Sequence, residues 1–171
     1  MREKNCGKSL KENKRKEMIT FGVMLALGLV FYFLPGMWIS VEEDSISYLA
    51  LERREGVMPG YIAFLAFFKA LLSEEYFLHG VVIAQSLLAL ICTFLFVVVL
   101  KKEFKLKRWE CILLYLGCML PFAIYLPEVG ITHQIMTEGI TYAIFYLFFI
   151  ALLKAVWTLI WEVWRLQFCL G

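Results

Sequence analysis

Three consecutive carboxylates are the side chains of this sequence best suited to proton transfer. Glu42, Glu43 and Asp44 follow one another in WISVEEDSISYLAL, directly after an apolar run. Neighbouring carboxylates raise one another's proton affinity, and an apolar interface raises it further, which suits one of them to act as a general base toward a hydroxyl. Acidic residues in this position also cap helices and complement the helix dipole, and this structural explanation stays open for Asp44.

A further acidic residue, Glu138, lies in ITHQIMTEGITYAIF at the head of another apolar run. Carboxylates at the mouth of a membrane are costly, so they are candidates for function. The structural alternative is that Thr137 caps a helix and Glu138 occupies its first turn. The predicted catalytic pair is Asp44 and Glu138, and the predicted supporting residues are Glu43, Tyr48 and His133.

Basic residues between the two acidic sites indicate how an anionic group would be bound. Arg53, Arg54 and Lys69 lie in the segment that follows Asp44. Guanidinium and ammonium groups bind phosphate and stabilise it as a leaving group, so we predict that these residues bind the phosphate of a donor. Anchoring to lipid headgroups explains Arg53 and Arg54 equally well. The sequence contains no C-x-x-C, H-E-x-x-H or glycine-rich phosphate motif, so no cofactor is evident and a divalent metal is left open.

The composition shows which solvent must surround these residues. Of the 171 residues, 61% are apolar, 16% are aromatic and 19% are charged. A soluble domain carries about 45–50% apolar and about 25% charged residues, so the apolar excess must be buried in lipid. The 17 Lys and Arg are nearly balanced by 15 Asp and Glu, which argues against nucleic acid as a partner.

Four runs with few or no ionisable side chains are candidate membrane spans. They cover residues 18–39, 80–100, 111–126 and 139–161, and the third is short and contains Pro121. The only charge in the fourth run is Lys154, near one end, where a long side chain reaches the headgroups. The sequence therefore predicts an all-α integral membrane protein with four transmembrane helices. It divides into a basic tail over 1–17 and a single membrane domain over 18–171.

The basic residues also predict the orientation of these spans. Lys and Arg cluster in 1–17 and 101–110, whereas 127–138 contains none. Because basic loops resist translocation, we expect both chain ends and 101–110 in the cytoplasm, and 40–79 and 127–138 outside the cell membrane. The basic tail is also expected to attract anionic lipid. None of the five cysteines lies in an outer loop, so no disulfide framework is implied.

The first outer loop, 40–79, is far longer than a simple connection requires. Ile46, Leu49 and Ala50 fall at helical spacing, and Pro59-Gly60 is expected to break the chain. Residues 61–72 are nearly all apolar and too few to span a membrane. We therefore predict two helices that lie in the outer interface.

In this order, the motifs resemble the N-terminal part of a GT-C superfamily membrane glycosyltransferase. The similarity comprises a basic tail and first span, then EEDSISYLAL, GVMPGYIAFLAFFKAL, a span that opens with VVIAQSLLALI, and a later TEG at the head of a span. The most similar group is the RgtA/B/C/D-like or dolichyl-phosphate-mannose-protein mannosyltransferase-like family 39. The resemblance implies that Asp44 deprotonates an acceptor hydroxyl while a polyprenyl phosphate leaves the sugar, and that Glu138 matches an acidic residue that begins a later span.

The sequence also departs from that family. Position 62 is Ile where the family often has a second proline, a Glu-Glu doublet precedes Asp44, and family members carry more spans. We therefore expect a truncated product or one half of a split enzyme. The alternative is a small non-enzymatic membrane protein that serves as a partner subunit or an inactive remnant. The expected partners are a polyprenyl-phosphate sugar donor, membrane lipid and a second chain that supplies the missing spans.

Overall fold

The computed structural model describes residues 2–33, 39, 43–50, 59–123 and 137–169. The side chains of 2–11, 43, 44, 47, 123, 138 and 161–169 lie outside that description. Within the described residues every regular element is a helix, as the sequence predicts. The helices are α1 (Arg2–Phe33), α2 (Glu43–Leu49), α3 (Pro59–Leu71), α4 (Phe77–Phe104), α5 (Arg108–Ala123) and α6 (Glu138–Cys169).

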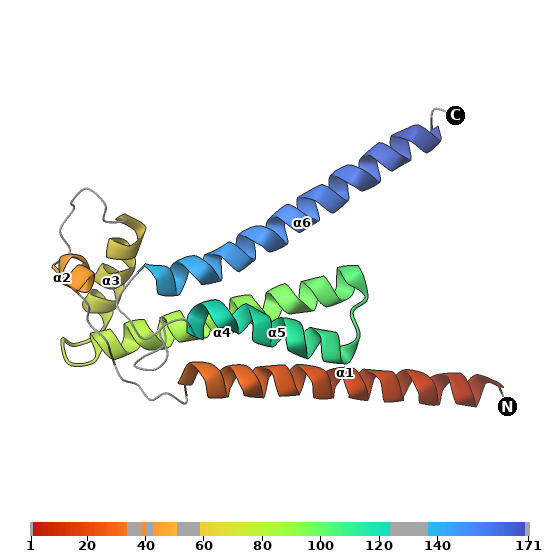
Figure 1. Ribbon diagram of the computed structural model, residues 1–171, viewed down its shortest axis with the longest axis horizontal. Helices are drawn as coiled ribbons and strands as arrows, with labels where there is room; N and C mark the ends of the chain where they lie inside the picture. Colours follow the sequence, from red (N-terminus) through yellow and green to blue (C-terminus); the bar gives the residue numbers. More distant parts are fainter. Residues whose placement is uncertain (1, 34–38, 40–42, 51–58, 124–136, 170–171) are drawn as a thin grey trace.

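Three helices are long and apolar enough to cross a membrane. Their spanning segments are Glu12–Phe33, Phe77–Phe104 and Gly139–Ile160, which correspond to three of the four predicted runs. The remaining predicted run, 111–126, falls largely in α5, which has 16 residues and contains Pro121. In Figure 1, α1 and α5 run toward the end where α3 lies, while α4 and α6 run away from it.

Several helix boundaries differ from those expected. Helix α1 begins at Arg2 and not near residue 18, so the basic tail is helical and continuous with the span. Lys and Glu are good helix formers, and an ion pair between Glu12 and Lys16 one turn apart adds to that preference. Pro59 and Gly60 form the first turn of α3 instead of a break before it. Proline suits this position because its fixed φ is already helical and no intrahelical N–H bond is lost there.

Helix α4 is the centre of the bundle. It packs against α1, α3, α5 and α6. Half of the most apolar stretch of α4 is buried within the protein, whereas only 6% of the corresponding stretch of α6 is buried. The buried core between α1, α4 and α5 includes Tyr32, whose hydroxyl lies 3.3 Å from Thr93 Oγ1. The Tyr32 ring packs edge-on against Phe122 of α5, with centroids 5.4 Å apart. One tyrosine of α1 therefore contacts both neighbouring helices.

The proline within α5 lies beside a hydrogen bond to α6. Because Pro121 has no N–H, it leaves a backbone carbonyl of the preceding turn without its helical donor and loosens the helix there. The Tyr146 hydroxyl of α6 donates to the neighbouring Cys118 carbonyl over 2.6 Å. Such side-chain donors compensate for helix irregularities in apolar surroundings. The bond therefore holds α6 to α5 in the turn that precedes Pro121.

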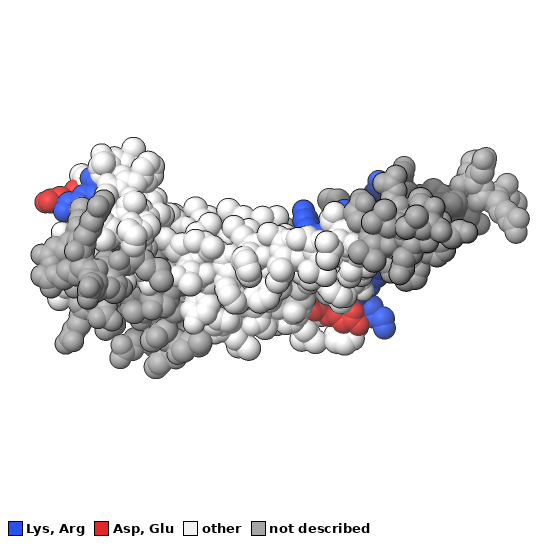
Figure 2. All heavy atoms as spheres, turned by 90° about the horizontal axis from the view of Figure 1, so that it is seen from above, with Lys and Arg blue, Asp and Glu red and all other residues white. Residues whose placement is uncertain are grey.

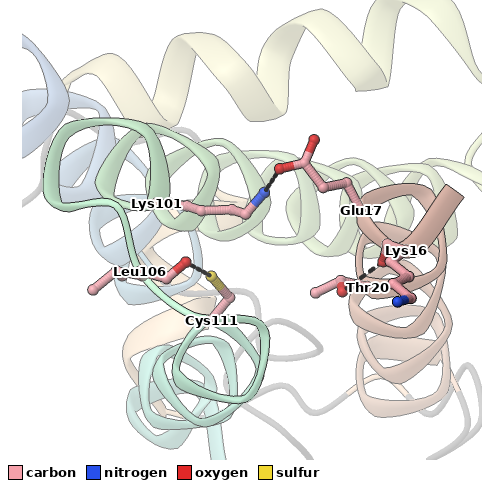
Figure 3. A network of polar contacts seen from close by, with 6 residues as sticks. All are labelled: Lys16, Glu17, Thr20, Lys101, Leu106 and Cys111. Carbon is pink, nitrogen blue, oxygen red and sulfur yellow. Dashed lines mark hydrogen bonds and ion pairs between the residues drawn. The ribbon is translucent and has the colours of Figure 1, made fainter. Parts of the chain in front are cut away.

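Charged side chains gather at the two ends of the molecule. On the face drawn in Figure 2, an uncharged middle section separates a small charged group near α3 from a larger one at the opposite end. At that larger group, which we call the basic end, Lys101 Nζ lies 2.7 Å from Glu17 Oε1 and 4.8 Å from the centre of the Phe21 ring. Figure 3 shows this ion pair between α4 and α1. An uncharged belt between charged ends is typical of a protein that crosses a membrane.

Close approach of α1 to its neighbours requires a glycine at position 28. A Cβ at buried Gly28 would collide with the Tyr115 hydroxyl of α5 and with Leu90 of α4, whereas a Cβ at exposed Gly22 would meet nothing within 4 Å. We expect Gly28→Val to destabilise the protein by about 1–3 kcal/mol, because the side chain must force the helices apart. Thermal unfolding in detergent micelles measures the effect. Gly22→Val is the matched control, and equal losses in the two variants would contradict the packing described.

Candidate functional site

The end of the bundle opposite the basic end is closed by a second hydrophobic cluster, which we call the apolar cap. Its buried residues come from α3 and α4, and partly buried residues of α2 and α6 pack against them. In Figure 1, α3 lies across the direction of α4 at this end. The buried members are Tyr61, Leu65, Val81 and Val82, and the residues packed on them are Ile39, Tyr48, Leu49, Phe64, Phe68, Phe77, Leu78 and Ile140.

Tyr61 is the residue that joins the elements of the apolar cap. Its ring packs edge-on against Tyr48 of α2, with centroids 5.1 Å apart, and stacks on Phe64 at 6.0 Å. Its hydroxyl accepts a hydrogen bond from Gln85 Nε2 of α4 over 3.2 Å. Aromatic contacts of this geometry stabilise beyond the area they bury. Tyr61 therefore fixes α2, which carries Asp44, to the central helix.

The apolar cap also buries polar side chains. Ser45, Gln85 and Ser86 have no exposed surface. Burying hydroxyl and amide groups is costly unless they form hydrogen bonds. Gln85 Nε2 donates to the Tyr61 hydroxyl, whereas Ser86 Oγ has no hydrogen-bond partner in the described part of the chain. Ser45, the residue after Asp44, lies on the face of α2 that is turned into the protein. The sequence analysis did not single out Tyr61, Gln85 or Ser45. The signal that could have revealed Gln85 is a polar amide side chain within a long apolar run.

Both predicted catalytic residues lie at the head of a helix that reaches the apolar cap. Asp44 is in the first turn of α2, whose Tyr48 and Leu49 pack on the cap. Glu138 is the first residue of α6, whose Ile140 packs on the same cluster. The side chains of both acids and of Glu43 lie outside the described part of the chain. Two helix heads that are far apart in the sequence are thus brought to one end of the bundle.

The start of α6 also agrees with the structural explanation for Glu138. The Thr137 carbonyl accepts hydrogen bonds from the backbone N–H groups of Ile140 and Thr141, at 3.1 and 2.9 Å. Thr137 therefore occupies the N-cap position, and Glu138 lies in the first helical turn, where a negative charge complements the helix dipole. Capping and chemistry are compatible, because the same dipole would hold a carboxylate in its ionised form.

Of the predicted phosphate-binding and supporting residues, two are described with their side chains. Lys69 is exposed in the last turn of α3, where a cation is favoured by the helix dipole. Tyr48 is half-buried against Tyr61. The predictions for Arg53, Arg54 and His133 fall outside the described residues.

A tight turn holds Lys69 close to the cap. Helices α3 and α4 are joined through Ser73, whose carbonyl accepts from the N–H groups of Tyr76 and Phe77, both at 3.0 Å. A Cβ at Gly80 would collide with Leu72 and lie 3.2 Å from Phe68 Cδ1, so only glycine allows the two helices to approach this closely. The turn therefore keeps the exposed end of α3 beside the start of α4.

Among the residues whose side chains are described, no group of three or more His, Cys, Asp or Glu is placed to hold a metal ion. Comparison with known proteins adds no assignment: no protein-family model matches the chain, and no match is found among curated proteins or solved structures. The description of the site therefore depends on its residues and their arrangement.

Removing the Tyr61 hydroxyl tests how the apolar cap is held together. We expect Tyr61→Phe to destabilise the protein by about 0.5–1.5 kcal/mol, because the hydrogen bond from Gln85 is lost while the aromatic packing is kept. Tyr48→Phe is the matched control, since its ring contact is retained and none of the described hydrogen bonds involves its hydroxyl. Thermal unfolding of both variants in micelles is the measurement. Equal stability of Tyr61→Phe and the unaltered chain would show that this bond does not hold the cap.

Proposed function

We propose that this chain is a GT-C-like glycosyltransferase module that transfers a sugar from a polyprenyl-phosphate donor to an acceptor hydroxyl on the outer face of the cell membrane. The observation that carries the proposal is the convergence of the heads of α2 and α6, which bear Asp44 and Glu138, on one apolar cap. The sequence resemblance supplies the reaction class.

In the proposed reaction Asp44 accepts the proton of the acceptor hydroxyl. The acceptor oxygen then forms a bond to the anomeric carbon of the sugar, and the bond from that carbon to the phosphate oxygen breaks with its electron pair. Lys69, together with Arg53 and Arg54, would stabilise the negative charge of the departing lipid phosphate. Glu138, Glu43, Tyr48 and His133 would orient the acceptor. The exposed position of Lys69 beside the cap supports this assignment.

The proposal includes four crossings of the membrane, with α5 as the short third span. Helix α4 ends at the basic end, whereas α6 begins at the apolar cap and runs in the same direction as α4. The chain must therefore return along the bundle between them, and α5 runs along that path. A helix of 16 residues covers about 24 Å, most of a hydrocarbon layer of roughly 30 Å. This topology leaves both chain ends on the cytoplasmic side.

Cysteine labelling tests this topology. In a chain with Cys6 and Cys169 replaced by serine, the remaining thiols of Cys92, Cys111 and Cys118 are buried. We expect Lys69→Cys to react with a membrane-impermeant maleimide added to intact cells, because Lys69 lies at the outer end. Lys105→Cys, at the basic end, should react only after the membrane is permeabilised. Labelling of both variants in intact cells would refute the proposed orientation.

Substitution of Asp44 tests the reaction itself. Membranes that contain the full chain would be supplied with a labelled polyprenyl-phosphate sugar, and transfer to acceptor would be measured. We expect Asp44→Asn to lower the rate by about 100-fold or more, because an amide cannot accept the proton. Glu74→Gln, which removes an exposed carboxylate between α3 and α4, is the matched control and should keep most of the activity. Unchanged transfer in Asp44→Asn would remove the proposed base, and parallel reactions with EDTA and with Mg²⁺ would decide whether a divalent cation takes part.

A second candidate function is a non-enzymatic partner subunit, and α6 provides the observation that favours it. Most of the spanning segment of α6 is exposed, including Phe145, Phe148 and Trp157. Such a surface suits packing against the helices of another chain as well as contact with lipid. Failure of the unaltered chain to bind the labelled donor, while its folded state is retained, would favour this function over glycosyl transfer.

A further inference from the structure

We propose that the basic end carries a binding site for the headgroups of anionic phospholipids. The site consists of Lys102, Lys105, Lys107, Arg108 and Lys154, which we call the basic collar. These residues come from the end of α4, the turn into α5, the start of α5 and the middle of α6. The proposal is independent of glycosyl transfer, which concerns the opposite end of the bundle.

The turn between α4 and α5 brings four members of the basic collar together. Lys105 adopts a left-handed conformation with φ of 52°, and the Leu106 N–H donates to the Lys101 carbonyl over 3.3 Å, which closes the end of α4. Glu110 then accepts from the Lys107 N–H over 2.7 Å and so caps the start of α5. These four basic residues therefore lie within one short stretch of the chain, at the end of the bundle where α4 turns into α5.

Lys154 joins the collar through the register between α4 and α6. The Phe96 ring lies 5.1 Å from the ring of Tyr146 and 6.4 Å from that of Phe149. The two helices run in the same direction, and Lys154 lies about two helical turns beyond that contact. The same number of turns along α4 leads from Phe96 to Lys102. Lys154 is therefore level with the basic end and not at the middle of the membrane.

The glutamates at this end are largely occupied by other partners. Glu12 pairs with Lys16, Glu17 pairs with Lys101, and Glu110 accepts the backbone N–H of Lys107. None of the described hydrogen bonds or ion pairs involves the side-chain nitrogens of the collar, and among the described side chains Glu103 is the remaining acidic one at this end. All five collar side chains are exposed. Arg108 interacts electrostatically with Glu12 and Glu17, so the positive charge that the protein does not neutralise comes from the four collar lysines.

Exposed apolar residues beside the collar indicate that its ligand is lipid and not a soluble polyanion. Phe104, Trp109 and Leu113 are each more than half exposed, at 54, 58 and 57%. Aromatic side chains next to Lys and Arg are typical of the headgroup region, where the rings contact acyl chains and the cations contact phosphate. A soluble polyanion would leave these apolar side chains in water. The chemistry thus matches the anionic lipids of the leaflet at the basic end.

Trp109 offers a direct test, because it lies within the collar. The full chain, with Trp38, Trp157, Trp161 and Trp164 replaced by phenylalanine, would be reconstituted into phosphatidylcholine vesicles. Trp109 fluorescence would then be quenched with brominated phosphatidylglycerol or with brominated phosphatidylcholine at equal mole fraction. We expect the affinity near Trp109 for phosphatidylglycerol to be at least about fivefold higher than that for phosphatidylcholine. This factor corresponds to the contribution of one basic side chain near an anionic surface. Added salt should reduce this preference.

Collar variants separate a charge effect from a loss of folding. Replacing Lys102, Lys105, Lys107 and Arg108 with glutamine should lower the preference several-fold, with the basic residues of α1 keeping a part of it, whereas replacing the three lysines with arginine should keep it in full. Lys69→Gln, at the opposite end, is the matched control and should leave the preference unchanged. The proposal is overturned if the unaltered collar shows equal quenching by both lipids, or if the glutamine variant retains the full preference and its salt dependence.

Discussion

Lipid offers no hydrogen-bond partner, so a polar group in the membrane-spanning part of this chain depends on a partner within the protein. That constraint accounts for the position of α4 at the centre of the bundle. Thr93 of α4 lies against the Tyr32 hydroxyl of α1, and Gln85 of α4 donates to Tyr61 of α3. A third interhelical bond joins Tyr146 of α6 to the carbonyl of Cys118 in α5. Each of these bonds specifies how one helix meets another.

The same constraint separates the two ends of the molecule by their chemistry. At one end, aromatic rings and a few buried polar groups close the bundle with α3 lying across it. At the other, Lys101 combines an ion pair with Glu17 and a contact with the Phe21 ring, and other basic side chains surround it. The larger charged group at one end and the aromatic packing at the other distinguish the two ends of the bundle. The proposed transfer chemistry and the proposed lipid site lie at opposite ends for that reason.

Some features of the fold could be predicted because they depend on neighbouring residues. The apolar runs that form α4 and α6 and the helical spacing of Ile46 and Leu49 all act over a few turns of one helix. The starts of α1 and α3 differ from the prediction because the local sequence at each of them is compatible with two structures. Pro59 begins a helix as readily as it interrupts one, and the charged residues before Met18 extend a helix as readily as they form a tail. The predicted span over 111–126 corresponds to α5. This helix is shorter than the other three candidate spans and has Pro121 near its end.

The sequence by itself determined that the chain is helical, that it contains long apolar runs able to cross a membrane, and that every basic residue except Lys154 lies outside those runs. These properties follow from composition and from spacing along a single helix. Only the tertiary structure decided that the heads of α2 and α6 reach one apolar cap, that Tyr61 meets Gln85, and that Lys154 is level with Lys102. Such pairings depend on which side chains fit together between helices, and the register of one helix against another is not encoded in the spacing of either one alone.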